Sequence, residues 1–282
     1  MPEKTLRYLK EKEALKQAFE INSDVSAYLA GHTRLLESVI AERTIASDLP
    51  KGIALLAAGG FGRAELFPFS DIDLLVLIPD RFPEDDAGRV SAFLTSLWDL
   101  GLSVGASVRT SGETLTDCSH DIALSTNFLE SRFLFGDKAL FEVTRSEYLR
   151  ALNPATFFRE KELEMHQRRR KHDDTPYELE PDIKDSPGGL RDIQMVLWCA
   201  KAAGLIDKPE DLVNRGIFTA EEWAEFSDAH AFLSDLRLRL HLMSRRAENR
   251  LLFEKQIPLA LSLGIKATSG LDAAELLMKR YY

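Results

Sequence analysis

Two aspartates, Asp71 and Asp73, stand two residues apart at the start of the hydrophobic run IDLLVLI, which predicts a strand over residues 72 to 78. Side chains two apart on a strand point to the same face, so both carboxylates project together while Ile72 points into the core. Two like charges this close repel unless a cation lies between them. Because Mg²⁺ binds through one or two carboxylates plus substrate phosphate oxygens, the pair predicts metal-assisted phosphoryl or nucleotidyl transfer. A solvent-facing strand edge without a metal is the structural alternative.

A glycine pair, Gly59 and Gly60, precedes the aspartates and directly follows IALLAA, which predicts a buried strand over residues 53 to 58. Glycines let a backbone approach a phosphate, and the start of a following helix offers unpaired N–H groups to an anion. Alone this signal is weak, because many glycines after strands only mark turns. Joined by Arg63 and Ser70, it predicts a nucleotide site. Arg63 either pairs with a phosphate or forms a salt bridge on a helix face.

Around these residues the pattern predicts a small α/β unit followed by an all-helical unit. Apolar residues at helical spacing predict N-terminal helices, and the strict alternation of LSVGASVRT predicts a third strand over residues 102 to 110. From about residue 115 onward the pattern is helical, including residues 119 to 135, and no strand is predicted there. The predicted domains are N-terminal helices at 1–50, an α/β domain at 51–138 that holds the proposed nucleotide site, and a helical domain at 139–282.

Composition narrows the functional class. A net charge of −9 over 282 residues argues against a general nucleic-acid binder, whose footprint is a basic field. No apolar run is long enough to span a membrane, and the charged N-terminus has no signal-peptide core. Cys118 and Cys199 show no metal or redox spacing, which suits a reducing cytoplasm. We therefore expect a cytoplasmic protein that binds neither membranes nor nucleic acid in general.

The segment GGFGRAELFPFSDIDLLVL resembles the nucleotidyltransferases of the DNA polymerase β superfamily, and within it the bacterial protein-PII uridylyltransferase/uridylyl-removing enzymes. The resemblance implies an α+β fold: a polymerase β-like nucleotidyltransferase domain with a small mixed sheet and helices, followed by an all-helical domain. It covers nearly all of the chain beyond the first 45 residues, and it continues, in order, through LWDLGLSVGASVRT, STNFLESRFLFGD, EPDIKDSPGGLRDIQ and RAENRLLFEKQ.

The resemblance implies transfer of UMP from UTP to a tyrosine of a PII-type signal protein, with release of pyrophosphate, in nitrogen regulation. The implied cofactor is Mg²⁺, with Mn²⁺ as an alternative ion. Asp71 and Asp73 match the catalytic, metal-binding carboxylates, and Gly59 and Gly60 match the phosphate-contacting glycines. Ser70 lies where a hydroxyl can also reach the triphosphate of UTP or of another NTP.

Lys184 is the candidate nucleotide ligand from the helical domain. It lies in EPDIKDSPGGLRDIQ, just before an amphipathic helix. If the helical domain leans over the nucleotide in a cleft, Lys184 reaches the triphosphate. Interdomain salt bridges are the equally weighted alternative.

The sequence departs from the family pattern on the third strand and at Ala64. Many members of the superfamily carry a third carboxylate on the matching strand, where Ala106 and its neighbours stand here. Asp121, or Glu180 and Asp182 in the carboxylate-rich loop 173 to 189, would be substitutes, unless they are helix caps or solvated loop charges. Ala64 replaces a glycine of the family, which we expect to be a tolerated change on a helix.

Two further expectations follow from the resemblance. Family enzymes continue into a hydrolase domain with an H…HD metal signature, which the six histidines here do not show, so we do not expect UMP removal. The rival functions are nucleotidyl transfer to another protein or to a small hydroxylated acceptor, and a degenerate, regulatory nucleotide-binding module. The intact pair Asp71 and Asp73 argues against the module.

Overall fold

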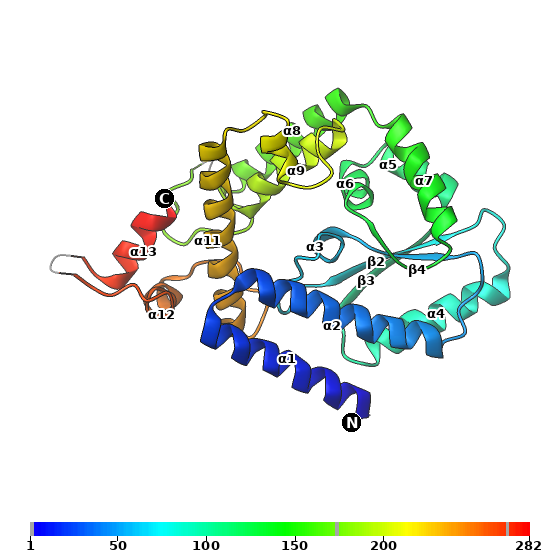
Figure 1. Ribbon diagram of the computed structural model, residues 1–282, viewed down its shortest axis with the longest axis horizontal. Helices are drawn as coiled ribbons and strands as arrows, with labels where there is room; N and C mark the ends of the chain where they lie inside the picture. Colours follow the sequence, from blue (N-terminus) through cyan, green and yellow to red (C-terminus); the bar gives the residue numbers. More distant parts are fainter. Residues whose placement is uncertain (1–2, 173–174, 269–270) are drawn as a thin grey trace. The chain divides into compact units, whose positions relative to one another are not determined.

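The computed structural model describes residues 3–172, 175–268 and 271–282, and the chain divides into two compact units, residues 1–152 and 153–282 (Figure 1). The sequence pattern placed the start of the helical domain at residue 139. In the structure, the helix Lys138–Ala151 packs against strands of the first unit and belongs to it. The first two residues of the loop 173 to 189 lie outside the described residues.

The first unit is a four-stranded sheet with helices on both faces (Figure 1). Its elements are α1 (Glu3–Asn22), α2 (Val25–Ala46), β1 (Ala54–Ala57), α3 (Gly59–Gly62), β2 (Ile72–Ile78), α4 (Glu84–Trp98), β3 (Val104–Thr110), α5 (Ser111–Cys118), α6 (Ile122–Leu129), β4 (Arg132–Gly136) and α7 (Lys138–Ala151).

The sheet is mixed, in the order β3-β2-β1-β4. Strand β2 runs parallel to β3 and antiparallel to β1, which in turn pairs antiparallel with β4. The parallel register sets Asp73 beside Gly105 and Leu74 beside Ala106. The predicted α+β class with a small mixed sheet is confirmed.

One face of the sheet carries the main core, between the strands and helices α2 and α4. Leu74 and Val76 of β2 pack there with Phe93 and Leu97 of α4, all at most 2% exposed. Because side chains alternate along a strand, Asp73 projects to the other face. Burial of one β2 face therefore fixes where the carboxylate points.

Strand β4 corrects the helical expectation for residues 119 to 135. The helix α6 ends at Leu129, and Arg132–Gly136 pairs with β1. The short run RFLFG contains Phe133 and Phe135 two residues apart, which fits a strand, but neighbouring apolar residues also continue the helical spacing of α6. Pairing with the exposed edge of β1, a long-range interaction, decides between the two.

The second unit is built from helices in its described part, which confirms the all-helical prediction. Isolated bridges such as Asp182 to Arg250 are its other regular pairings. None of the described helices of either unit combines the length and the apolar character that a membrane crossing requires. The helices are α8 (Pro154–Arg170), α9 (Leu190–Ala202), α10 (Asp211–Asn214), α11 (Ala220–Ser244), α12 (Phe253–Ser262) and α13 (Ala273–Tyr281).

Candidate active site

The turn from β1 into α3 requires glycine at position 59. Ala58 is extended, and Gly59 then adopts φ +53°, a left-handed conformation that L side chains disfavour. A Cβ built at Gly59 would lie 2.6 Å from Oδ2 of Asp73. The glycine therefore serves two ends: it turns the chain, and it leaves room for the Asp73 carboxylate against the backbone.

The two aspartates lie at the start of β2. Asp71 is exposed, immediately precedes the first residue of the strand, and accepts a hydrogen bond from the Ser103 hydroxyl. Asp73 is partly buried, and its backbone oxygen accepts from the Ala58 N–H at 3.0 Å. Its Oδ1 faces β3, where a Cβ at Gly105 would lie 3.3 Å away. Glycine backbone thus borders both oxygens of the Asp73 carboxylate.

This donor set suits a magnesium ion shared with a substrate. Among the described residues, no group of three or more His, Cys, Asp or Glu side chains is placed to hold a metal. A site with two carboxylates leaves most coordination positions to water and substrate oxygens, which is how Mg²⁺ is usually held beside phosphates. The glycines at positions 59 and 105 keep space open around Asp73. Asp71 and Asp73 therefore fit Mg²⁺ as the resemblance implies.

Arg63 follows α3 and forms ion pairs within the unit. Its guanidinium contacts Glu130 at 2.6 Å and Glu65 at 3.0 Å, and the Glu130 side chain is only 3% exposed. Burial alone would lower the pKa of Arg63, but its Coulombic attraction to Glu130 and Glu65, and the hydrogen bonds it donates to both, raise that pKa above the ordinary value. Of the two interpretations offered by the sequence, the salt bridge describes Arg63 in this structure.

The backbone on either side of Arg63 is closely packed at Gly62 and turns sharply at Ala64. A Cβ at Gly62 would lie 2.4 Å from the Glu130 backbone oxygen, so only glycine allows α3 to approach that segment. Ala64 adopts φ +60° in the turn after α3. The expected place of Ala64 on a helix was wrong, because position 64 is a left-handed turn residue, for which glycine is the unstrained choice. Tolerance of the change stays a prediction.

Gly60 and Ser70 are the other two residues of this loop that the sequence predicts to contact the nucleotide. Gly60 belongs to α3, and an added Cβ would make only ordinary contact with the Glu65 backbone oxygen, at 3.5 Å. Ser70 lies in the turn before β2, where its N–H donates to the Phe67 oxygen at 3.2 Å. Neither position contradicts a nucleotide contact, and both assignments stay predictions.

A pocket of about 270 Å³ opens beside Asp73 on the face away from the main core. Asn127 of α6 lies at this pocket and was not predicted from the sequence. It is exposed between buried neighbours, and its Oδ1 would be 3.8 Å from a Cβ at Gly59. The sequence alone does not reveal this residue, because the signal is an exposed amide among buried helix residues, and it can be recognised only when the buried face of α6 is known.

Asp121, a candidate substitute base, is a helix cap. Its carboxylate accepts from the N–H groups of Ala123 and Leu124 at the start of α6. On β3, Gly105 rather than Ala106 stands beside Asp73, and Ala106 packs against the main core. Position 105 is therefore where a third carboxylate would join the pair.

The remaining candidates belong to the second unit, where the carboxylates bind their own backbone. Glu180 accepts from the Phe253 N–H, and Asp182 accepts from the N–H groups of Lys184 and Asp185, each at 2.8 Å. Burial lowers the pKa of Lys184, and the nearby Arg191 and Arg237 lower it further. A nucleotide contact by Lys184 stays a prediction.

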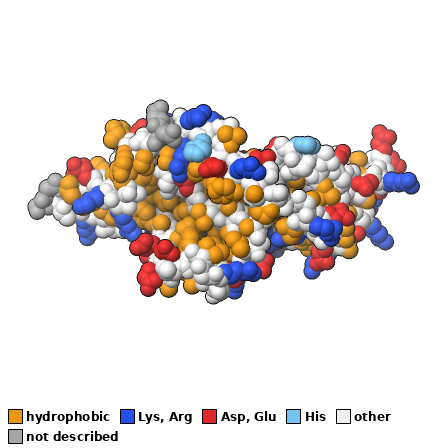
Figure 2. All heavy atoms as spheres, turned by 90° about the horizontal axis from the view of Figure 1, so that it is seen from above, with side chains coloured by type: hydrophobic (Ala, Val, Ile, Leu, Met, Phe, Trp, Pro, Cys, Tyr) orange, Lys and Arg blue, Asp and Glu red, His pale blue; other side chains and the backbone are white. Residues whose placement is uncertain are grey.

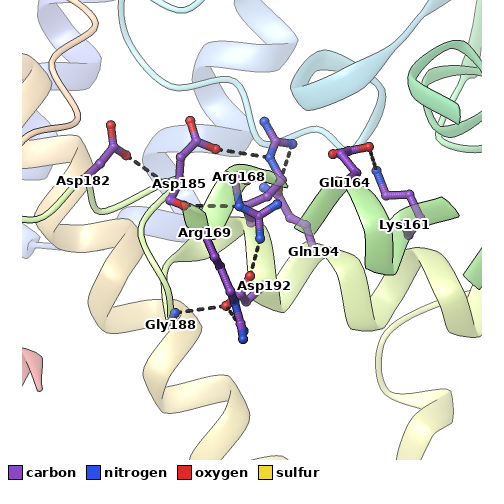
Figure 3. Close-up of polar contacts among 10 residues, drawn as sticks. Lys161, Glu164, Arg168, Arg169, Asp182, Asp185, Gly188, Asp192 and Gln194 are labelled. Carbon is purple, nitrogen blue, oxygen red and sulfur yellow. Dashed lines mark hydrogen bonds and ion pairs between the residues drawn. The ribbon is translucent and has the colours of Figure 1, made fainter. Parts of the chain in front are cut away.

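Two arginines of the second unit share one acid, Asp192. Figure 3 shows Arg168 and Arg169 directed at Asp192, whose carboxylate also accepts from the Gly188 N–H. On the face drawn in Figure 2, Lys and Arg side chains are interspersed with Asp and Glu rather than gathered into one field.

Known proteins resemble this chain along most of its length. A family model described as GlnD PII-uridylyltransferase matches residues 156–282. A bifunctional uridylyltransferase/uridylyl-removing enzyme of Cupriavidus pinatubonensis is 42% identical over 272 residues, 96% of this chain and 31% of that protein. One from Aromatoleum aromaticum is 44% identical over 268 residues, 95% of this chain and 31% of that protein. The resemblance seen in the sequence is confirmed, and the chain spans about a third of the length of these relatives.

One solved structure also matches in part. A chain in a crystal structure of a toxin–antitoxin with AMP-PNP covers 49% of this chain and 96% of its own length, at 18% identity. Its TM-score of 0.27 is too low to show a shared fold.

Proposed function

We propose that this chain transfers UMP from UTP to a tyrosine of a PII-type protein, because residues 156–282 match the family described as GlnD PII-uridylyltransferase and nearly the whole chain resembles bifunctional uridylyltransferases. The observation that carries the proposal is the pair Asp71 and Asp73, set against the left-handed turn at Gly59. The relatives extend well beyond the aligned region, and the activity in their names guides the choice of substrates proposed here.

The proposed reaction is a displacement at the α-phosphorus of UTP. The phenol oxygen of the acceptor forms a bond to that phosphorus, and the bond from the phosphorus to the bridging oxygen breaks. Pyrophosphate leaves with the bonding electrons, and the phenol proton passes to water. Since a tyrosine hydroxyl has a pKa near 10, it ionises more readily than a serine hydroxyl and needs less help from a base.

Each residue of the loop has a part in this reaction. Asp71 and Asp73 would hold Mg²⁺, which when bound neutralises charge on the phosphates. The α3 turn at Gly59 and Gly60 lets the triphosphate approach the backbone. Ser103 orients Asp71 through its hydroxyl, and the Arg63 ion pairs hold α3 against the segment before β4.

The test is a transfer assay with each of the four NTPs, Mg²⁺ and a PII-type protein, read by intact mass of the acceptor. UMP addition to one tyrosine, lost on chelating the metal and restored by Mg²⁺, is expected. Addition of another nucleotide would change the substrate. Unmodified PII with every NTP would overturn the proposal, and addition to a different protein or small molecule would favour the alternative acceptor.

A further inference from the structure

The pocket beside Asp73 extends from the carboxylate toward β3 and the helix after it. Gly105, Ser107 and Arg109 of β3 line it, together with Cys118 at the end of α5. From β1 and the turn into α3, Ala58 alone is among the described lining residues. The pocket therefore lies mainly on the β3 side of the proposed metal site.

The order of the strands gives that side a chemical meaning. The sheet runs β3-β2-β1-β4, so β3 and β1 flank the aspartates on β2 from opposite sides. The proposed phosphate contacts, Gly59 and Gly60, follow β1. In phosphoryl and nucleotidyl transfer the attacking and leaving oxygens lie roughly in line on opposite sides of the phosphorus. A group held on the β3 side approaches opposite to the pyrophosphate.

The lining also fits one kind of group. Leu75, Leu124 and Phe128 supply apolar walls, and Asp73 lies at the border with the proposed metal site. The volume of about 270 Å³ compares with roughly 30 Å³ for one water in the liquid, so an aromatic ring has room. The rest of the lining includes polar side chains, among them Arg109 and Asp117, which form an ion pair with each other. A pocket with apolar walls and a polar border suits an aromatic ring that ends in a hydroxyl.

We propose that this pocket receives the side chain of the acceptor tyrosine, with its ring between α6 and the β3 face and its hydroxyl toward Asp73. The inference rests on the proposed function and deepens it by naming the acceptor subsite. It also explains why position 105 is a glycine: the backbone of β3 borders Asp73 without a side chain that would narrow the entrance to the pocket.

The two cysteines allow a test on the unaltered protein. Cys118 lines the pocket, and Cys199 lies in α9 of the second unit, and both are free and partly exposed. Burial raises the pKa of the Cys118 thiol to about 11 and also raises that of Cys199. Alkylation is therefore carried out in brief pulses at alkaline pH, because the thiolate is the reactive form, and each cysteine is followed by peptide mass spectrometry.

Four conditions are compared: no addition, a non-hydrolysable UTP analogue with Mg²⁺, the analogue with a PII-type protein, and the analogue with the same protein carrying a Tyr→Ala acceptor. With the intact acceptor, Cys118 alkylation should slow about tenfold, which corresponds to about nine-tenths occupancy. The analogue alone and the Tyr→Ala acceptor should leave the Cys118 rate near its starting value. The Cys199 rate should be the same in all four conditions.

Protection by the analogue alone would assign the pocket to the nucleotide and overturn the inference. Equal protection by the Tyr→Ala acceptor would overturn it too, because another part of the partner would then cover Cys118. A parallel transfer assay distinguishes failure of the subsite from failure of the proposed function. UMP transfer without protection of Cys118 would refute the subsite and leave the proposed function standing. Absence of transfer overturns the proposed function, and the inference with it.

Discussion

Two loops of this chain are rich in glycine and carboxylates, and they use them in opposite ways. In the loop from 180 to 192, Asp182 and Asp192 accept hydrogen bonds from backbone N–H groups, and Asp192 also pairs with two guanidinium groups. In the loop from 59 to 73, glycine backbone borders the Asp73 carboxylate. The comparison teaches that the same residue types can surround a carboxylate in two ways: backbone N–H and guanidinium groups point at Asp192, whereas glycines make room beside Asp73.

The backbone of the loop from 180 to 192 is closely packed against itself. A Cβ at Gly189 would lie 2.8 Å from the Ile183 oxygen and 2.9 Å from the Lys184 oxygen, so the chain folds tightly on itself. The N–H groups at the start of α9 donate back to this loop: those of Leu190 and Arg191 bond the same two carbonyl oxygens. The N–H groups of Leu190 and Arg191 are therefore paired within the chain.

The largest effect should come from Asp73→Asn. It keeps the shape of the side chain but removes a metal-holding charge, so transfer should fall about 10³-fold, or roughly 4 kcal/mol of transition-state stabilisation. Thermal melting without metal should be unchanged or raised, since one of two repelling charges is gone. A large fall in melting temperature would make the aspartates structural, like those of the other loop.

Acid should lower the free energy of unfolding through His32, which contacts the loop from 59 to 73. This residue of α2 is 2% exposed, and its ring bonds the Leu66 oxygen at 2.9 Å. Burial lowers its pKa to about 4 from 6.5. The unfolded chain therefore binds the proton first as pH falls, so stability is lost between pH 6.5 and 4, by about 3 kcal/mol in total.

Urea unfolding at neutral pH and near pH 4.5 measures this effect. His32→Asn should lose less stability on acidification than the wild type, by most of that amount. The exposed His120 provides the control, and His120→Asn should follow the wild type. Identical pH dependence in all three proteins would show that His32 is not protonated on unfolding in this range.

Asp192→Ala tests the structural loop. It leaves Arg168 and Arg169 without their shared carboxylate and removes the acceptor of the Gly188 N–H. Because the Asp192 side chain is 19% exposed, we expect a loss of about 2 kcal/mol in unfolding free energy, below the cost of breaking a fully buried pair. The exposed Glu254→Ala should change stability by less than about 0.5 kcal/mol. Equal effects would remove the energetic distinction between paired and surface acids.

Gly59→Ala asks whether the turn itself matters. The left-handed φ should cost about 1–2 kcal/mol of stability, and the new Cβ must displace Asp73, which should lower transfer by up to about 10²-fold. Gly88→Ala is the matched control, because Gly88 lies in α4 with nothing within 4 Å of an added Cβ. It should gain about 0.5–1 kcal/mol and keep full activity. Equal changes of stability and activity in the two variants would refute the close approach of position 59 to the Asp73 carboxylate.

Local residue spacing predicted part of this site. The rest depends on long-range contacts, which the sequence did not predict. Short apolar runs predicted β1 and β2, and alternation predicted β3. The two-residue period of a strand then predicted a shared face for Asp71 and Asp73. It did not predict that Glu130, far along the chain, pairs with Arg63, because no spacing rule links two such distant positions. The role of Asn127 also depends on where α6 packs. Strand β4 was missed because its edge pairing, rather than its own sequence, defines it.

The smallest effect should come from Ala64→Gly, at the turn where this chain departs from the pattern of the family that it resembles. The left-handed conformation costs an L residue about 1–2 kcal/mol, while glycine loses about 0.5–1 kcal/mol more chain entropy on folding. The balance predicts a gain of about 0.5 kcal/mol, read by urea unfolding, with transfer unchanged. Ala92→Gly in the exposed face of α4 should instead lose about 1 kcal/mol. If both variants lose stability equally, the turn after α3 is unstrained with alanine, and the proposed need for glycine there is wrong.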